Sequence, residues 1–326
     1  SNQRCPNGFG GQRNTDRYAQ AAPSAGSFNT CPPLEIWEIQ GAGMSSPYDG
    51  FFVSTDADVV TAVASNGFVM QTPDAGTDGD VDTSDGIFVF TGGAPGVDEG
   101  DLVDVSGFIV EFFDFTEFSG SVSVVEVGSG SLPTAVTFDA TKPSPDPTFS
   151  NCAIEFECWE GMLVDVPVGT VTGPNQEFPG DTFAEVYITT TAPRTFREPG
   201  VIYPGLGMPP IPTWDGNPEV FELDDDRLGL ANMAIPAGSA FSATGILGFE
   251  FFDYELWPTS LTVVPAPLPV PVDPRAPGEF TVGTLNLFRL YDDVDDPTDA
   301  DGRNDSVVST AEYMTRLTKF AGYIVD

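Results

Sequence analysis

The chain of 326 residues is strongly acidic, with 49 Asp and Glu residues against 12 Lys and Arg residues and a formal net charge of −37. Such a surface repels phosphate, so it disfavours unaided binding of nucleic acid and favours divalent cations and high salt. The chain contains no histidine, which excludes a Ser-His-Asp catalytic set and any zinc site that uses histidine. No apolar run reaches about 18 residues, so we expect no segment of the sequence to span a membrane.

The composition is typical of a mainly β protein with a large core. Hydrophobic residues make up 40% of the chain and include 26 phenylalanines, which argues against a disordered chain. Val, Thr, Phe and Gly are abundant, and long stretches with a helical period are nearly absent. The length indicates two or more domains. The acidity fits a salt-adapted secreted protein or a calcium-loaded one, and the two can coexist.

Residues 1–32 form a polar segment that we predict to be an N-terminal arm. The arm has little periodicity and carries three basic residues, Arg4, Arg13 and Arg17. Two interpretations are open. The arm is either a tail tied down by a disulfide against its own barrel, or an extension that docks on an acidic neighbouring subunit and builds a homo-oligomer or polymer.

The chain has four cysteines, Cys5, Cys31, Cys152 and Cys158. They allow three pairings, and none has the CxxC spacing of a zinc site. The simplest pairing joins neighbours in the sequence, Cys5 with Cys31 and Cys152 with Cys158. Disulfides persist in oxidising compartments, so we expect a secreted, extracellular protein in which Ser1 is a processed mature end.

Residues 33–140 are predicted to form a first OB-like β domain. Short runs with strand patterning are separated by glycine-rich turns, a pattern that suits a small closed barrel. The expected strands lie at 36–41, 48–63, 67–71, 85–91, 102–113 and 121–127.

Residues 141–264 are predicted to form a second OB-like domain related to the first by an internal repeat. GFIVEFFDFTE at 107–117 matches GILGFEFFDYE at 245–255 with one inserted residue, and YDGFFV at 48–53 matches WEGMLV at 159–164. The phenylalanine pairs in these repeats have two interpretations. They alternate between two buried faces, or they are exposed and stack on bases as in other OB-folds, although no positive groove is evident.

A proline-rich stretch at 265–278 is predicted to be an extended linker, because alternating prolines favour a semi-rigid polyproline spacer. A new segment, 279–326, then begins with a strand expected at 281–288, followed by an acidic loop. Ser309 and Glu312 have the spacing of a capping box and predict the start of a helix with one apolar face.

Several phrases carry a resemblance to a known family. In chain order they are EIQGAGMSSPYDG, TSDGIFVFTG, EGDLVDVSGFIVEFFDFTEF, WEGMLVDVP, FAEVYITT, RTFREPGVIYPG and EFTVGTLNLFRLYDDVDD. The chain resembles the N-terminal part of large secreted bacterial nucleases, in which OB-fold modules precede an endonuclease/exonuclease/phosphatase domain. The resemblance implies that residues 279–326 begin that domain, here truncated, and that Asn286 belongs to its metal and phosphate site.

The same resemblance implies that the catalytic site is incomplete. The family's next residue is a glutamate ligand beyond Asp326, and its catalytic histidines have no counterpart here. Phosphodiester hydrolysis needs carboxylate ligands for Mg²⁺ and a general base, which an asparagine alone does not supply. We therefore expect the chain by itself to be inactive and Mg²⁺ to belong to the missing catalytic part.

An acidic loop in the first domain is the best candidate metal site. Its sequence, DAGTDGDVDTSD, alternates acidic residues with glycines, so that several oxygens can converge on one hard cation. It lacks the twelfth-position glutamate of an EF-hand, and a solvated acidic loop is the alternative. The candidate calcium ligands are Asp74, Asp78, Asp80, Asp82 and Asp85, and weaker candidates lie at 224–226 and 292–301.

Two classes of function follow. In the first, the chain is the non-catalytic N-terminal portion of a secreted metal-dependent nuclease-like protein, with a positioning or scaffolding role. In the second, it is an extracellular structural subunit that self-assembles into a fibre or surface layer, stabilised by Ca²⁺. Neither hypothesis expects this chain alone to bind nucleic acid.

Overall fold

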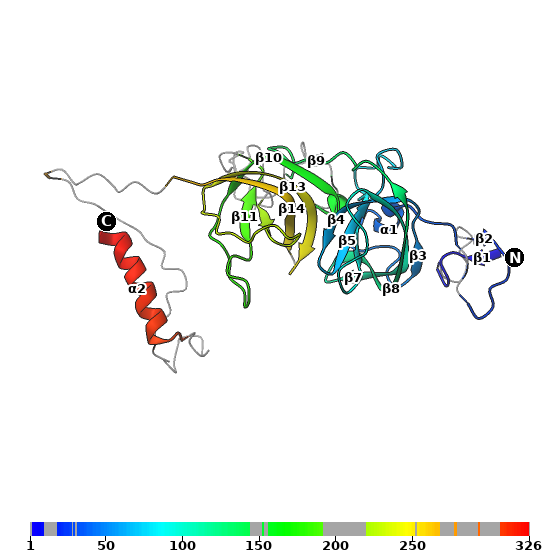
Figure 1. Cartoon of the computed structure of the whole chain (residues 1–326), viewed down its shortest axis with the longest axis horizontal. Helices are drawn as coiled ribbons and strands as arrows, with labels where there is room; N and C mark the ends of the chain where they lie inside the picture. The colour runs from blue at the N-terminus through cyan, green and yellow to red at the C-terminus, as the bar shows by residue number, and fades with distance from the viewer. Residues whose placement is uncertain are drawn as a thin grey trace, which may run out of the picture. The chain divides into compact units, whose positions relative to one another are not determined.

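A computed structural model of the chain describes residues 2–9, 18–27, 29, 31–143, 152, 156–191, 220–251, 253–267, 277–278, 293 and 307–325. The chain divides into two compact units, Ser1–Ala266 and Pro267–Asp326. The division falls inside the predicted linker. The first unit is mainly β and contains two closed five-stranded barrels, as the sequence predicts, and a helix lies near the C-terminus (Figure 1). None of the helices in the described residues is both long and apolar enough to cross a membrane.

The first barrel is built from β3 (Phe52–Ser54), β4 (Asp58–Ala64), β5 (Gly67–Gln71), β6 (Gly86–Phe90), β7 (Asp101–Phe112) and β8 (Phe115–Ser129). Five strands close in the order β4-β5-β6-β8-β7, because β7 pairs with both β8 and β4, and β3 adds to β7. The pair β6–β8 is parallel and the others are antiparallel. This connectivity is that of a Greek-key barrel of the OB type.

The second barrel repeats this topology. Its strands are β9 (Val136–Thr137), β10 (Leu163–Val171), β11 (Val186–Thr189), β12 (Phe221–Leu223), β13 (Ala240–Glu250) and β14 (Asp253–Val264). Five of them close in the order β10-β11-β12-β14-β13, and β12–β14 is again the parallel pair within the ring. The short β9, on the N-terminal side of the predicted boundary at 140, pairs in parallel with β10.

Strand register confirms the internal repeat. Phe52 pairs with Phe108 in the first barrel, and Leu163 pairs with Ile246 in the second. These are the residues that the two sequence matches place in equivalent positions. The repeated segments are therefore the same two elements of each barrel. One is the strand that pairs with the long β-hairpin, β3 in the first barrel and β10 in the second, and the other is the hairpin itself.

The prediction of a strand at 36–41 is wrong, since Ile36–Gln40 is the short helix α1. A capping box between Glu35 and Glu38 starts the helix. Ile36 and Ile39, three residues apart, lie on one face and are buried in the first barrel's core. A spacing of three places both side chains on one face of a helix, whereas in a strand they would point to opposite faces, so this signal for a helix was present in the sequence.

The predicted strand at 48–63 is divided into β3 and β4. Ala57 lies at the break with a positive φ of 59°, and its N–H donates to Asp104 Oδ1 at 3.0 Å. A left-handed residue interrupts strand geometry, so this local bend could not be read from hydrophobic patterning.

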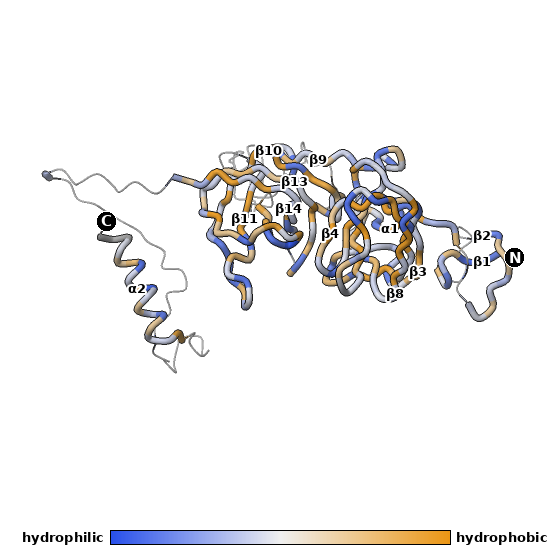
Figure 2. The backbone as a smooth tube through the Cα atoms, viewed as in Figure 1, coloured by the Kyte–Doolittle hydropathy of each residue, from blue (hydrophilic) through white to orange (hydrophobic). Residues whose placement is uncertain are grey.

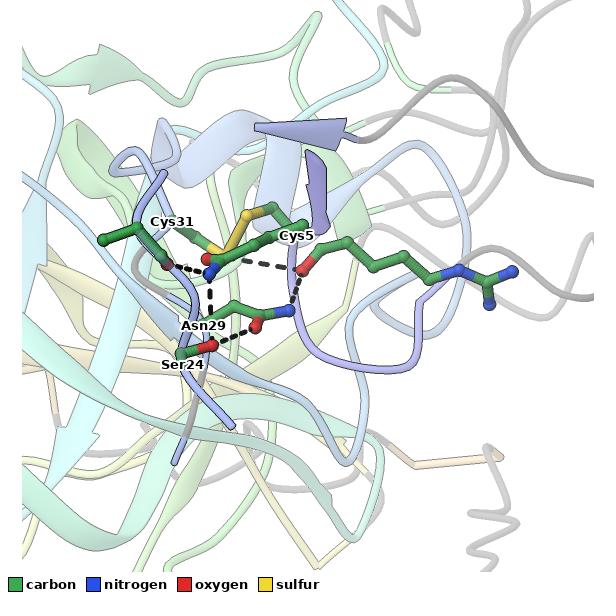
Figure 3. The surroundings of a disulfide bond; sticks show 7 residues. Cys5, Ser24, Asn29 and Cys31 are labelled. Carbon is green, nitrogen blue, oxygen red and sulfur yellow. Dashed lines mark hydrogen bonds between the residues drawn. A yellow bond between two sulfur atoms is a disulfide. The ribbon is translucent and has the colours of Figure 1, made fainter. Parts of the chain in front are cut away.

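The N-terminal arm contains a small hairpin, β1 (Asn2–Arg4) with β2 (Tyr18–Gln20), and the disulfide Cys5–Cys31. Polar contacts surround the disulfide (Figure 3). Ser24 Oγ donates to Asn29 Oδ1 at 2.7 Å, and Asn29 Nδ2 donates to the Arg4 carbonyl at 2.6 Å.

The arm also contacts its own barrel. The ring of Phe9 stacks on Tyr48 at 4.9 Å and meets Phe51 edge-on at 5.3 Å. For the described part of the arm, this contact favours the first interpretation, a tail tied down against its own barrel. The second predicted disulfide, Cys152–Cys158, is also present, so the local pairing is confirmed.

Hydrophobic residues follow the barrel strands (Figure 2), and each barrel has its own core. In the first barrel the core includes Phe68, Ile87 and Phe118, all fully buried. In the second it includes Trp159 and Phe221. A third cluster combines residues of both barrels and is described with the candidate site.

The second unit is described mainly through α2 (Thr310–Val325). The predicted capping box is confirmed. The Ser309 N–H donates to Glu312 Oε2 at 2.9 Å, and the Glu312 N–H donates back to Ser309 Oγ at 3.3 Å. Met314 and Leu317, on the predicted apolar face, are exposed. The strand expected at 281–288 lies outside the described residues.

Candidate functional site

The two barrels share a buried apolar interface. The indole ring of Trp257 on β14 packs edge-on against Phe115 at 5.7 Å and Phe88 at 6.3 Å, both from the first barrel. The shared cluster comprises Ala62, Ala64, Val69, Phe88, Phe115, Leu163, Ile246, Phe249 and Trp257. Because its side chains come from both barrels, neither barrel can complete this cluster alone.

Glu160 is the polar centre of the interface. It belongs to the second barrel and is fully buried, yet its hydrogen bonds reach the first. Its Oε1 accepts from Gln40 Nε2 at 3.3 Å and from the Thr116 N–H at 3.1 Å, and its backbone carbonyl accepts from Ser84 Oγ at 2.6 Å. Burial, then the charge of Glu157, raises the pKa of Glu160 well above its ordinary value.

Close backbone contact completes the interface. A Cβ on Gly86 would lie 2.1 Å from the Gly161 carbonyl oxygen, so only glycine fits there. The Leu163 N–H donates to Gln71 Oε1 at 2.9 Å, which is a further bond from the second barrel to the first. These contacts fix the two barrels to one another within the first unit.

A pocket opens at the edge of this interface. It has a volume of about 450 Å³, and aromatic side chains from both barrels line it. The lining residues are Asn66, Phe88, Phe90, Phe112, Phe113, Phe115, Glu117, Ser119, Arg227, Phe249, Glu250, Phe251 and Trp257. Cavities of this size with few polar groups are typical of binding sites.

The tips of the two repeated hairpins converge on the pocket. Phe113 follows β7 and Phe251 follows β13, each as the first residue of a two-residue turn. Both have a left-handed backbone, with φ of 52° and 50°, and both are exposed, at 61% and 71%. Phe251 also stacks on Phe178 at 5.9 Å. The prediction that the repeat phenylalanines alternate between buried faces is therefore wrong at these tips.

Two charged groups face the aromatic lining. Arg227 pairs with Glu250 at 2.9 Å, and its guanidinium lies 4.8 Å from the centre of the Trp257 ring, a cation–π distance. Glu117 is buried, and burial raises its pKa to about 7. The pocket thus offers aromatic faces, one paired cation and a carboxyl that titrates near neutral pH.

The predicted calcium loop is described, but its carboxylates spread apart. Asp74 accepts from the Thr134 N–H at 2.9 Å and from its hydroxyl at 2.7 Å, and these bonds lower its pKa. Asp78 accepts from the Asp80 N–H at 2.9 Å, and Asp80 accepts from the Asp82 N–H at 3.1 Å. Burial, then the charge of Asp78, raises the pKa of Asp85 to about 6.

In the part of the chain that the structure describes, one group of three acidic side chains has oxygens within 4.8 Å of one another, and this group is Asp224, Asp225 and Asp226. This is one of the weaker sequence candidates. Calcium binding at 74–85 stays a prediction. Asn286 lies outside the described residues, as do residues 292–301 apart from Asp293.

The sequence analysis did not single out Glu160 or Trp257. The repeat did contain a signal for Glu160. WEGMLV aligns with YDGFFV, so an acidic residue followed by glycine occurs at the same place in both repeats, and in the second these residues are Glu160 and Gly161. No family model, curated protein sequence or solved structure matches the chain.

Proposed function

We propose that the chain is the non-catalytic N-terminal portion of a secreted, metal-dependent nuclease-like protein, in which two OB-like barrels act as one rigid scaffold. The observation that carries the proposal is the buried interface around Glu160 and Trp257. A flexible pair of barrels would need only a linker. Here a cluster of apolar side chains and the hydrogen bonds of a buried carboxyl hold the barrels in one arrangement, which is what a positioning role requires.

We expect the chain by itself to be catalytically inactive, and this expectation is directly testable. Incubation of the pure chain with plasmid DNA and Mg²⁺, Mn²⁺ or Ca²⁺ should give no cleavage, because the chain has no histidine and no complete metal site of the family. The matched control is Asn286→Ala. Metal-dependent cleavage by the pure chain that this substitution abolishes would overturn the proposal.

A second candidate function is the self-assembling extracellular subunit, and the exposed hairpin tips favour it. Phe113 and Phe251 project beside a pocket that is itself lined with phenylalanines. The occupant we propose is a second copy of this chain, whose tips would pack into the same pocket. A self-complementary contact of this kind closes into a dimer, so a fibre or layer would need a second, head-to-tail contact between dimers, for which the predicted arm is the candidate.

Light scattering and electron microscopy test this second function. Assembly of the full chain in Ca²⁺ should be lost in a Phe113→Asn, Phe251→Asn double variant. Deletion of residues 1–32 serves as the comparison for the predicted arm. A full chain that stays monomeric at every salt and Ca²⁺ concentration, or a double variant that assembles as well as the parent, would exclude contact through the tips.

A further inference from the structure

The second barrel carries a concentration of acidic side chains where β11 and β12 meet. Val186 pairs with Leu223 in this antiparallel pair. Glu185, just before β11, and Asp224, just after β12, therefore lie next to one another at the same end of the two strands. Asp224 is followed by Asp225 and Asp226, and oxygens from these three carboxylates lie within 4.8 Å of one another. The fold therefore gathers four carboxylates from two strands.

Hydrogen bonds from backbone N–H groups and from one side-chain amide hold these carboxylates in place. Asp224 Oδ1 accepts from the N–H groups of Asp226 at 3.1 Å and Arg227 at 3.0 Å. Asp225 Oδ2 accepts from the Met233 N–H at 2.9 Å, and Asp226 Oδ2 accepts from Asn232 Nδ2 at 3.1 Å. The side chains are thus fixed before any ligand arrives, which lowers the entropy lost when a ligand binds.

Two of the carboxylates are buried with an oxygen that has no hydrogen-bond partner. Asp225 is 2% exposed and its Oδ1 accepts no hydrogen bond. Glu185 is 7% exposed and its Oε2 likewise has no partner. A buried carboxylate oxygen without a donor is costly, so these atoms point to a ligand that supplies positive charge.

In the described parts of residues 156–267, no side chain supplies that charge. In residues 156–191 and 220–267, the one basic side chain is Arg227, and it pairs with Glu250 at 2.9 Å. Protons or a metal ion must therefore neutralise the group.

We infer that Asp224, Asp225 and Asp226, with Glu185 beside them, form a Ca²⁺ site at the end of the β11–β12 pair. All donors are oxygens, which hard cations prefer, and there is no histidine or free cysteine that would select zinc or copper. Ca²⁺ accepts irregular arrangements of six to eight oxygens, so it suits a turn better than Mg²⁺, which demands an octahedron. The site stands independently of the scaffold and self-assembly proposals.

Calcium titration of the full chain tests the inference. Isothermal titration calorimetry with CaCl₂ at fixed ionic strength should show a saturable site, and Mg²⁺ should bind more weakly. Asp224→Asn with Asp226→Asn should abolish that binding. Asp225→Asn alone should weaken it by about tenfold or more, because ligand charge sets calcium affinity.

The matched control is Asp80→Asn with Asp82→Asn in the first barrel, which should leave this binding unchanged. Thermal unfolding shows whether the variants are folded. Without calcium, Asp224→Asn with Asp226→Asn should melt at or above the parent's temperature, since it removes repulsion, and it should lose the rise that calcium gives the parent. The inference is overturned if the parent shows no saturable calcium binding, if NaCl stabilises it equally, or if only the control pair removes binding.

Discussion

At the residue scale, Glu160 is a fully buried carboxyl at the interface between the two barrels. Its oxygen accepts from Gln40 and Thr116 of the first barrel, and no cation lies among its hydrogen-bond partners. The ionised form would carry the cost of a buried charge and meet Glu157 and Glu111 as like charges, which is why the pKa of Glu160 is raised.

The sign of the pH dependence follows from the direction of the pKa shift. The pKa of Glu160 is raised above its ordinary value of 4.5 in the folded state, so folding takes up a proton. The stability linked to Glu160 is complete below the unfolded pKa and is lost as pH rises toward the folded pKa, by about 1.4 kcal/mol per pH unit.

We predict that Glu160→Gln, which resembles the neutral acid, will reduce the fall in unfolding free energy between about pH 5 and about pH 8. Near pH 5 the variant and parent should be similar, and near pH 8 the variant should be the more stable. Denaturant unfolding across this range measures the effect, and the exposed Glu126→Gln is the control. Parallel pH profiles for parent and Glu160→Gln would show that the carboxyl is not held neutral.

At the element scale, each of the repeated hairpins carries an exposed phenylalanine with a left-handed backbone at its tip. Both residues of the β7–β8 turn, Phe113 and Asp114, have positive φ, at 52° and 70°. Turns of this kind favour Asn or Gly, and a bulky aromatic residue there is uncommon. The second hairpin repeats the feature at Phe251, so the strain occurs at equivalent positions of both barrels. Strain of this sort often marks a functional surface.

We predict that Phe113→Asn will stabilise the chain by about 0.5–1 kcal/mol, because asparagine tolerates left-handed backbone and the lost ring is largely exposed. Denaturant unfolding is the measurement. Phe112→Asn is the matched control, since Phe112 is also exposed but ends the regular strand. A clear loss of stability in Phe113→Asn would mean that the ring contributes more to folding than to binding.

At the scale of the whole first unit, the contacts between the two barrels couple their unfolding. The shared cluster around Trp257 and the hydrogen bonds of Glu160 join them, while each barrel keeps a core of its own. Coupling of this kind makes the stability of one barrel depend on side chains of the other.

We predict that Trp257→Ala will cost about 3–5 kcal/mol and will weaken both barrels, because the indole packs on Phe88 and Phe115 of the first. Hydrogen exchange should show faster exchange in β6 as well as in β14. The matched control is Trp159→Ala, a buried tryptophan of the second barrel's own core, which should leave β6 protected. Equal protection of β6 in parent and Trp257→Ala would show that the barrels fold independently.

The sequence by itself determined the features that depend on local chemistry. Strand alternation and glycine-rich turns predicted a mainly β chain with two barrels, and repeated phrases predicted that the barrels share one topology. The capping box at Ser309 and the pairing of Cys5 with Cys31 followed from short spacings. These signals are local: the hydrogen bonds of a capping box join residues three apart, and a disulfide between neighbouring cysteines closes one small loop.

Tertiary structure alone decided which carboxylates are buried and which aromatic rings stay exposed. Glu160 meets Ser84 across a sequence separation of 76 residues, and only the docking of two barrels gives the carboxyl its burial and its raised pKa. The loop at 74–85 has the better calcium pattern in sequence, yet the three carboxylates that converge follow β12. Burial and convergence depend on non-local strand pairing, which composition and spacing do not encode.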